Sequence, residues 1–271
     1  MTEALTRLTQ LTRVYGDHPP LGDGAAIIAW DETGVDRREQ VRVTFDGWAK
    51  GLQGRADEPL SVRLARLNLR LFQELGLRGD EDGYDDPVNS RIDEVIQRRR
   101  GLPILLSIVT IEVAARVGLH LDPIGFPGHF LVSPREGEPR FYVDPFHAGA
   151  ILRQDDLRAR LNIGMAGRGV SPEVMEQLLG PLSPRLTLTR MNHNLKGSWS
   201  RRGDTARALA AVDRILALAP EQVDEHRDRG VLLVQLERPE EALDAFESYL
   251  RLVPGASDAP TVRGWMRSLR R

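Results

Sequence analysis

The sequence predicts an α+β domain followed by an all-α repeat region, and three observations lead to this. Two segments in the C-terminal third repeat each other at a constant offset of 34 residues. Two short runs rich in aromatic and aliphatic residues, 129–132 and 141–144, indicate one antiparallel hairpin, whereas most other segments show the helical spacing of apolar residues. With 271 residues and 41% hydrophobic content, the chain can form two globular domains.

Composition limits the possible chemistry. The chain has no cysteine, which excludes disulfides, thiolate metal sites and a cysteine nucleophile. Its 37 Lys and Arg against 39 Asp and Glu give no general affinity for nucleic acid or an anionic membrane. The N-terminus lacks the apolar core of a secretory signal, and the longest apolar stretch, 104–115, is shorter than the ~20 residues of a membrane helix. We therefore expect a cytoplasmic protein without membrane contact, and nucleic acid is not an expected partner.

Residues 2–79 are predicted to be mostly helical. Within 61–75, leucines at three- and four-residue spacing share one helix face: Leu64, Leu67, Leu71 and Leu75. A turn-rich segment then leads to Ser90, which begins the sequence SRID and fits a capping box that opens a helix over 91–100. Pro103 suits the first turn of a second helix, which Gly118 can end.

The two strand-like runs are predicted to pair as a hairpin. If Val132 faces Phe141, His129 lies opposite Asp144, and directly opposed side chains are ~5 Å apart at Cβ. We therefore expect a hydrogen bond between His129 and Asp144. A carboxylate in this position orients an imidazole as a general base. The alternative is that His129 is a packed residue after a turn and Asp144 closes the loop that follows it.

The 34-residue offset is the period of the tetratricopeptide repeat. It relates six residues of one unit to six of the next: Ala208, Leu209, Ala211, Leu216, Leu218 and Pro220 correspond to Ala242, Leu243, Ala245, Leu250, Leu252 and Pro254. Asp204 is expected to cap a helix, and Pro239 to stand in the first turn of another. The alternative is a chance likeness between two amphipathic helices.

These elements divide the chain into a first domain at 1–165, a bridging segment at 166–188 and a repeat domain with a capping helix at 189–271. Two repeats are fewer than the roughly three that a free-standing array needs. We therefore expect the repeat domain to bury an apolar face against the first domain, through residues around 186–195.

The run GLPILLSIVTIEVAARVGLHLDPIGFPGHFLVSP, followed by FYVDPFHAG, resembles the transglutaminase-like core. It is similar in particular to bacterial SirB-type proteins, in which that core precedes tetratricopeptide repeats. The resemblance extends upstream through Tyr84, Asn89-Ser90 and RIDEVIQRRRGLP, and downstream through TRMNHNLKGSW and HRDRGVLL, and it is weaker over residues 1–60. It implies helices packed on a small antiparallel sheet, as in papain-like enzymes.

The resemblance also implies where a catalytic triad would lie. The cysteine of catalytic members lies two residues after one glycine and fifteen before another, and Gly101 and Gly118 both place it at Pro103. His129 and Asp144 match the histidine and aspartate of the triad. Base and orienter are therefore kept without the nucleophile, an arrangement typical of SirB-type members.

Proline has no nucleophilic atom, so a thiolate mechanism is closed at position 103. Ser107 lies one helical turn further on the same face and could approach the same pocket. The alternative is a packing serine whose hydroxyl bonds back to the preceding turn. His120, His129 and His147 lack the H-x-x-x-H spacing, so we expect no metal site, and no cofactor is expected.

The sequence therefore predicts a pseudoenzyme: a non-catalytic interaction or adaptor protein that binds a protein or peptide partner through its repeat domain. The alternative is a hydrolase or acyltransferase that uses Ser107 or an activated water together with His129 and Asp144.

Overall fold

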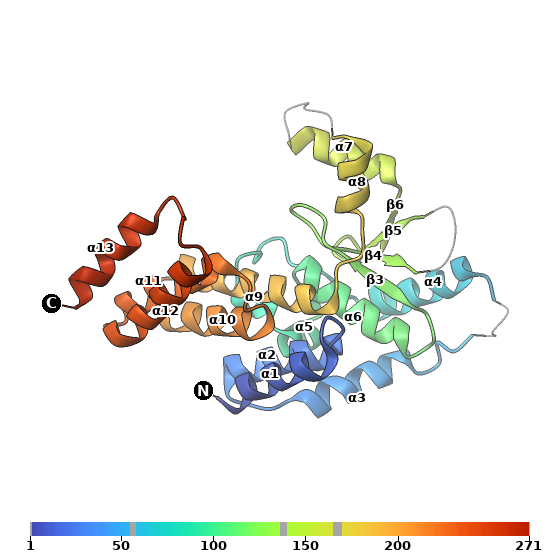
Figure 1. The fold of residues 1–271 in the computed structure, drawn as a ribbon. Coiled ribbons are helices and arrows are strands. Elements are labelled where there is room, and N and C mark those ends of the chain that lie inside the picture. Colours follow the sequence, from blue (N-terminus) through green and yellow to red (C-terminus); the bar gives the residue numbers. More distant parts are fainter. Residues whose placement is uncertain (1, 55–57, 136–139, 165–169, 271) are drawn as a thin grey trace.

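A computed structural model describes residues 2–54, 58–135, 140–164 and 170–270, and Figure 1 shows the ribbon. The α-helices of the first half are α1 (Glu3–Tyr15), α2 (Leu21–Thr33), α3 (Arg38–Ala49), α4 (Leu60–Asn68), α5 (Ile92–Arg98) and α6 (Pro103–Ala115), and α2, α3 and α5 pack against the buried α6. The later helices are α7 (Gln154–Gly164), α8 (Pro172–Leu178), α9 (Pro184–Arg201), α10 (Thr205–Leu218), α11 (Val223–Gln235), α12 (Pro239–Leu252) and α13 (Ala259–Leu269).

Two small sheets accompany the helices. One pairs β1 (Arg78–Gly79) with β2 (Arg100–Gly101) in parallel, and the other has four antiparallel strands in the order β3 (Leu121–Ile124), β4 (Leu131–Pro134), β5 (Tyr142–Asp144) and β6 (Ala150–Leu152). Helix α6 packs against β3 and β4, and Phe130, Val132 and Val143 join its core. The predicted α+β fold with a small antiparallel sheet is confirmed.

Helix α6 is apolar on all sides and is buried accordingly. Residues 103–110 are all buried, and partly or fully exposed positions occur only among residues 111–115. Pro103 is the first helical residue, as predicted, and Gly118 follows the helix with a φ of 68°, a left-handed conformation that favours glycine. An all-round apolar helix of this kind belongs in a core, where it positions the elements around it.

The predicted register of the hairpin is wrong by two residues. Val132 pairs with Val143 and not with Phe141, so Asp144 lies level with Leu131 at the start of β4 and His129 precedes the strand. A shift of two residues keeps every side chain on its original face, because the side-chain period of a strand is 2. His129 therefore remains a diagonal neighbour of Asp144, within reach of an aromatic side chain.

The predicted capping box at Ser90 is also wrong. Ser90 ends a short 3₁₀ helix, Pro87–Ser90, and Arg91 takes the N-cap position of α5 without a capping side chain. Asp93 pairs with Arg37 instead, at 2.9 Å. The proline three residues before Ser90 starts the tight turn that removes the serine from the cap position.

The repeat is present at the predicted period. Helix α12 begins and ends 34 residues after α10, and the small residues Ala208 and Ala242 are fully buried in the two hairpins. Asp204 caps α10 by accepting the Arg207 backbone N–H at 3.0 Å, and Pro239 is the first residue of α12. Helix α13 follows as the predicted last helix.

The first repeat is part of the main core. Leu188, Met191 and Leu195 of α9 are fully buried in the hydrophobic cluster formed by α1–α6. A Cβ atom on Gly24 would lie 2.3 Å from Leu188 Cδ1, so glycine permits the close contact of α2 with α9. This face lies within the predicted contact region 186–195.

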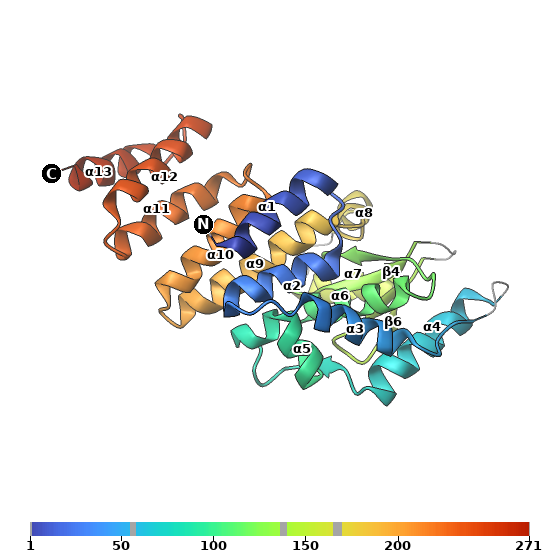
Figure 2. The ribbon, with the colours of Figure 1, turned by 90° about the horizontal axis from the view of Figure 1, so that it is seen from below.

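Helices α11–α13 stand at one end of the molecule, away from the sheet (Figure 2), and share a second hydrophobic cluster with Leu209 of α10. The predicted boundary at residue 165 lies outside the described residues. The division into 1–165, 166–188 and 189–271 remains a prediction.

Candidate functional site

The position that the sequence resemblance assigns to a triad nucleophile, residue 103, lies at the N-terminus of α6. Leu102 is the N-cap, Pro103 is the first helical residue, and both are buried. Gly101 precedes them in β2, where a Cβ atom would lie 2.5 Å from Val95 Cγ2. The backbone is thus tightly packed here, and the residue at position 103 offers no group that can attack a substrate.

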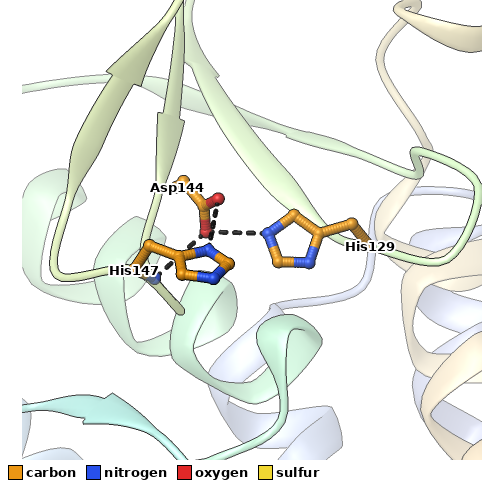
Figure 3. Close-up of side chains that lie close together, drawn as sticks. All are labelled: His129, Asp144 and His147. Carbon is orange, nitrogen blue, oxygen red and sulfur yellow. Dashed lines mark hydrogen bonds and ion pairs between the residues drawn. The ribbon is translucent and has the colours of Figure 1, made fainter. Parts of the chain in front are cut away.

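His129 and Asp144 form the expected hydrogen bond. The distance from His129 Nε2 to Asp144 Oδ1 is 2.8 Å, and Figure 3 shows a ring nitrogen of His129 directed at the carboxylate. The aspartate comes from the end of β5 and the histidine from the turn before β4. The two side chains meet because β4 and β5 pair, as predicted. They are diagonal neighbours across the two strands and not directly opposed residues. A catalytic role of the pair remains a prediction.

A second histidine, His147, binds the same carboxylate and was not identified as a partner from the sequence. Its Nδ1 lies 2.8 Å from Asp144 Oδ2, and its backbone N–H donates to Oδ1 at 3.2 Å (Figure 3). Arg160 of α7 adds a longer contact, with Nη1 3.4 Å from Oδ2. The sequence DPFH could have indicated this contact. An aspartate at the start of a turn accepts hydrogen bonds from backbone N–H groups a few residues later, which brings His147 next to Asp144.

Asp144 stays ionised in this environment. Its side chain is fully buried, and burial alone would raise the pKa of the carboxyl. The hydrogen bond and the charge of His129, followed by those of His147, outweigh burial and lower the pKa to about 2. The carboxylate can therefore orient both imidazole rings at neutral pH.

The loop that carries His129 is held by a residue of the first repeat. Arg190 of α9 donates from Nη2 to the carbonyl oxygens of Phe126 and His129, at 3.0 and 3.1 Å. Its guanidinium also lies 5.5 Å from the centre of the Phe130 ring. Arg190 therefore positions His129, and sequence spacing could not have identified it because the two residues are 61 positions apart.

Ser107 is a buried packing residue of α6 and lacks both of the hydrogen bonds that the sequence suggested for it. Its side chain is fully buried, and its Oγ has no hydrogen-bond partner among the described residues, so it bonds neither to the preceding turn nor to His129. Thr110 is the residue that bonds back, to the Leu106 carbonyl at 2.8 Å. The structure brings His129 and Asp144 together and does not join Ser107 to them.

Comparison with known proteins gives two matches, one after the other along the chain. The profile of the transglutaminase-like superfamily matches residues 39–193, and a tetratricopeptide repeat profile matches residues 195–267. A UPF0162 protein of Xylella fastidiosa (strain Temecula1) is 35% identical over 263 residues, which are 96% of this chain and 93% of the relative. A UPF0162 protein of Vibrio cholerae is 31% identical over 203 residues, 74% of each chain.

A third relative is eukaryotic. F-box only protein 21 of Homo sapiens is 28% identical over 171 residues, which are 59% of this chain and 26% of the relative. The shared part is thus a segment of a much longer protein.

The fold and these comparisons define a transglutaminase-like protein that carries tetratricopeptide repeats. Within that class the chain belongs to the UPF0162, or SirB-like, family. Among the described residues, no helix is both long and apolar enough to cross a membrane.

Proposed function

We propose that the chain acts by binding a peptide segment of another protein through its repeat region, and that it performs no acyl transfer through a cysteine-type nucleophile. Two observations support the absence of such a reaction: Pro103 stands where the family resemblance places the nucleophile, at the first turn of α6, and the chain has no cysteine. Helical hairpins of the tetratricopeptide kind present extended faces that bind peptides, which supports the binding role.

The observation that carries the proposal is an apolar hollow of about 290 Å³ between α11, α12 and α13. Its lining is almost entirely apolar: Val231, Val234, Gln235, Phe246, Trp265, Ser268 and Leu269. Trp265 and Val234 are 41% and 39% exposed, so two large apolar side chains meet solvent at this place. Exposed apolar surface with a hollow is typical of a peptide-binding site.

The charge around the hollow indicates the chemistry of the partner. Helix α13 carries Arg263 and Arg267 and has no acidic residue, and Arg270 follows it. Arg267 makes no ion pair among the described residues, and Arg270 pairs with Glu247 at 2.8 Å. The expected ligand is therefore a segment with apolar anchor residues flanked by carboxylates.

Selection and variant binding test the proposal. Peptides are selected from a displayed library on the full chain, and their affinities are measured by fluorescence anisotropy. We expect selected peptides to be apolar and acidic, and Val234→Glu to weaken their binding by roughly tenfold or more. The control is Val14→Glu, an equally apolar exposed position on α1, which should leave affinity unchanged. Equal affinity for Val234→Glu and wild type would contradict the proposed site.

A second candidate function is hydrolysis, favoured by the His129–Asp144 hydrogen bond. With Nε2 bound to Asp144, the other ring nitrogen of His129, Nδ1, has no hydrogen-bond partner in the part of the chain that is described. A free imidazole nitrogen next to an oriented carboxylate is what a general base requires. The nucleophile would be Ser107 or a water molecule.

Turnover of an activated ester such as p-nitrophenyl acetate separates these possibilities. If Ser107 and His129 act as one unit, Ser107→Ala and His129→Ala should each lower the rate by about two or more powers of ten. Loss in His129→Ala alone would indicate an activated water. Equal rates in both variants and wild type would leave the binding function as the supported one. Ser107→Ala removes a hydroxyl that bonds to none of the residues the structure describes, so the variant should fold normally.

A further inference from the structure

The groups around Asp144 have the composition of a metal site. Among the described residues, His129, Asp144 and His147 form the group of three potential ligands whose donor atoms lie within 4.8 Å of one another. Figure 3 shows both rings directing a nitrogen at the same carboxylate. Spacing in the sequence could not predict this group, because His129 precedes β4 and His147 follows β5. The two histidines meet only when these strands pair.

We propose that His129 Nε2, His147 Nδ1 and the carboxylate of Asp144 bind one divalent transition-metal ion, with zinc as the representative ion. Ligand atoms ~2.1 Å from a tetrahedral zinc are about 3.4 Å apart. Two of the corresponding distances here, from each nitrogen to its nearer carboxylate oxygen, are 2.8 Å. A small outward movement of the rings would therefore admit the ion. Two imidazoles favour zinc and its neighbours over magnesium or calcium, which prefer oxygen ligands.

The surroundings of Asp144 suit a cation. The Asp144 carboxyl group is fully buried, and each of its oxygens faces a ring nitrogen: Oδ1 faces Nε2 of His129, and Oδ2 faces Nδ1 of His147. The backbone N–H of His147 donates a hydrogen bond to the carboxylate of Asp144 and so holds its orientation. Hydrogen bonds to a ligand's side chain orient the ligands of metal sites in the same way. The His147 side chain is 49% exposed, so an ion can arrive from solvent and water can complete its coordination.

Arg160 is the group that opposes binding. Its Nη1 lies 3.4 Å from Asp144 Oδ2, where it supplies positive charge to the same carboxylate. The side chain is 44% exposed and can move into solvent when an ion binds. Replacing it with an uncharged residue should therefore strengthen metal binding, a change that a merely structural hydrogen-bond network would not predict.

The test is titration of the metal-free full chain with Zn²⁺ by calorimetry, and with Co²⁺ by visible absorption. We expect one ion per chain and the intense absorption of four-coordinate cobalt. His147→Ala should weaken zinc affinity by roughly tenfold to a hundredfold. His147→Asp should recover part of it, because it restores an oxygen ligand. Arg160→Gln should tighten binding, and Mg²⁺ should give no saturable heat.

The control is His120→Ala, which removes an exposed histidine outside the group and should leave zinc affinity unchanged. Far-ultraviolet circular dichroism of each variant verifies folding. Absence of zinc binding to the wild-type chain, or equal affinity in wild type and His147→Ala, would overturn the proposal. Peptide binding at α11–α13 is a separate property, so failure of one proposal does not decide the other.

Discussion

Arg214 of α10 donates a hydrogen bond from Nη1 to Asp31 Oδ2 of α2 at 2.7 Å, although both side chains are almost completely buried. The same guanidinium bonds to Glu32 through Nη2 and to Asn192 Oδ1 of α9 through Nε, the latter at 2.8 Å. One arginine of the first repeat thus bonds to helix α2 and to α9, the helix with which α10 forms its hairpin. This network couples the stability of the repeat to that of the transglutaminase-like part.

Removing this arginine should destabilise the whole chain. Arg214→Met leaves Asp31 and Glu32 buried without their positive partner, and breaking a buried ion pair in this way costs about 3–5 kcal/mol. Arg238→Met is the matched control, because Arg238 pairs with Glu241 at the surface, where a pair contributes roughly 0–1 kcal/mol. Urea unfolding gives both values. Similar free energies of unfolding for the two variants would contradict the proposed importance of the network.

The isolated repeat region should fold poorly. A fragment of residues 189–271 loses the surface against which Met191 and Leu195 are buried, and it loses the acidic partners of Arg214. Two hairpins then have too little core for a cooperative structure. Thermal circular dichroism should show a broad, weak transition in the fragment and a sharp one in the full chain. A cooperative transition of the fragment at the temperature of the full chain would refute this expectation.

The stability contributed by Asp144 should depend on pH in a defined direction. Its pKa is about 2 in the folded chain, below the ordinary aspartate value of 3.8, so the native state binds this proton less readily than the unfolded state. The contribution, about 2 kcal/mol, is complete well above the unfolded pKa and is lost as the pH falls through the folded pKa. By pH 3 roughly half should be gone.

Urea unfolding of wild type and Asp144→Asn at pH 5 and pH 3 measures this loss. The difference in the free energy of unfolding between the two proteins should shrink at the lower pH. If the difference is the same at both values, the carboxylate is not held ionised by His129 and His147.

Local sequence patterns predicted the elements whose structure one short segment determines. The 34-residue period located α10 and α12, because small residues and prolines mark the close contact and the ends of each hairpin. Pro103 at the start of α6 follows equally from local rules. The His129–Asp144 pair was identified through an incorrect register, and it persisted because a two-residue shift preserves the face of the strand.

Features that depend on tertiary packing were missed. Arg214 meets Asp31 across 183 positions of sequence, and no local pattern relates them. Arg190 reaches the His129 loop from α9 in the same way. His147 was considered only for ligand spacing, whereas its contact with Asp144 arises from the turn after β5.

The most direct test of the central claim compares the repeat region with the histidine–aspartate pair in one binding measurement. The affinity of a selected peptide is measured by calorimetry for wild type, Trp265→Ala and His129→Ala. We predict that Trp265→Ala weakens binding by roughly tenfold or more and that His129→Ala leaves it unchanged. Loss of binding in His129→Ala, with wild-type affinity in Trp265→Ala, would place the functional surface at the transglutaminase-like site and contradict the account.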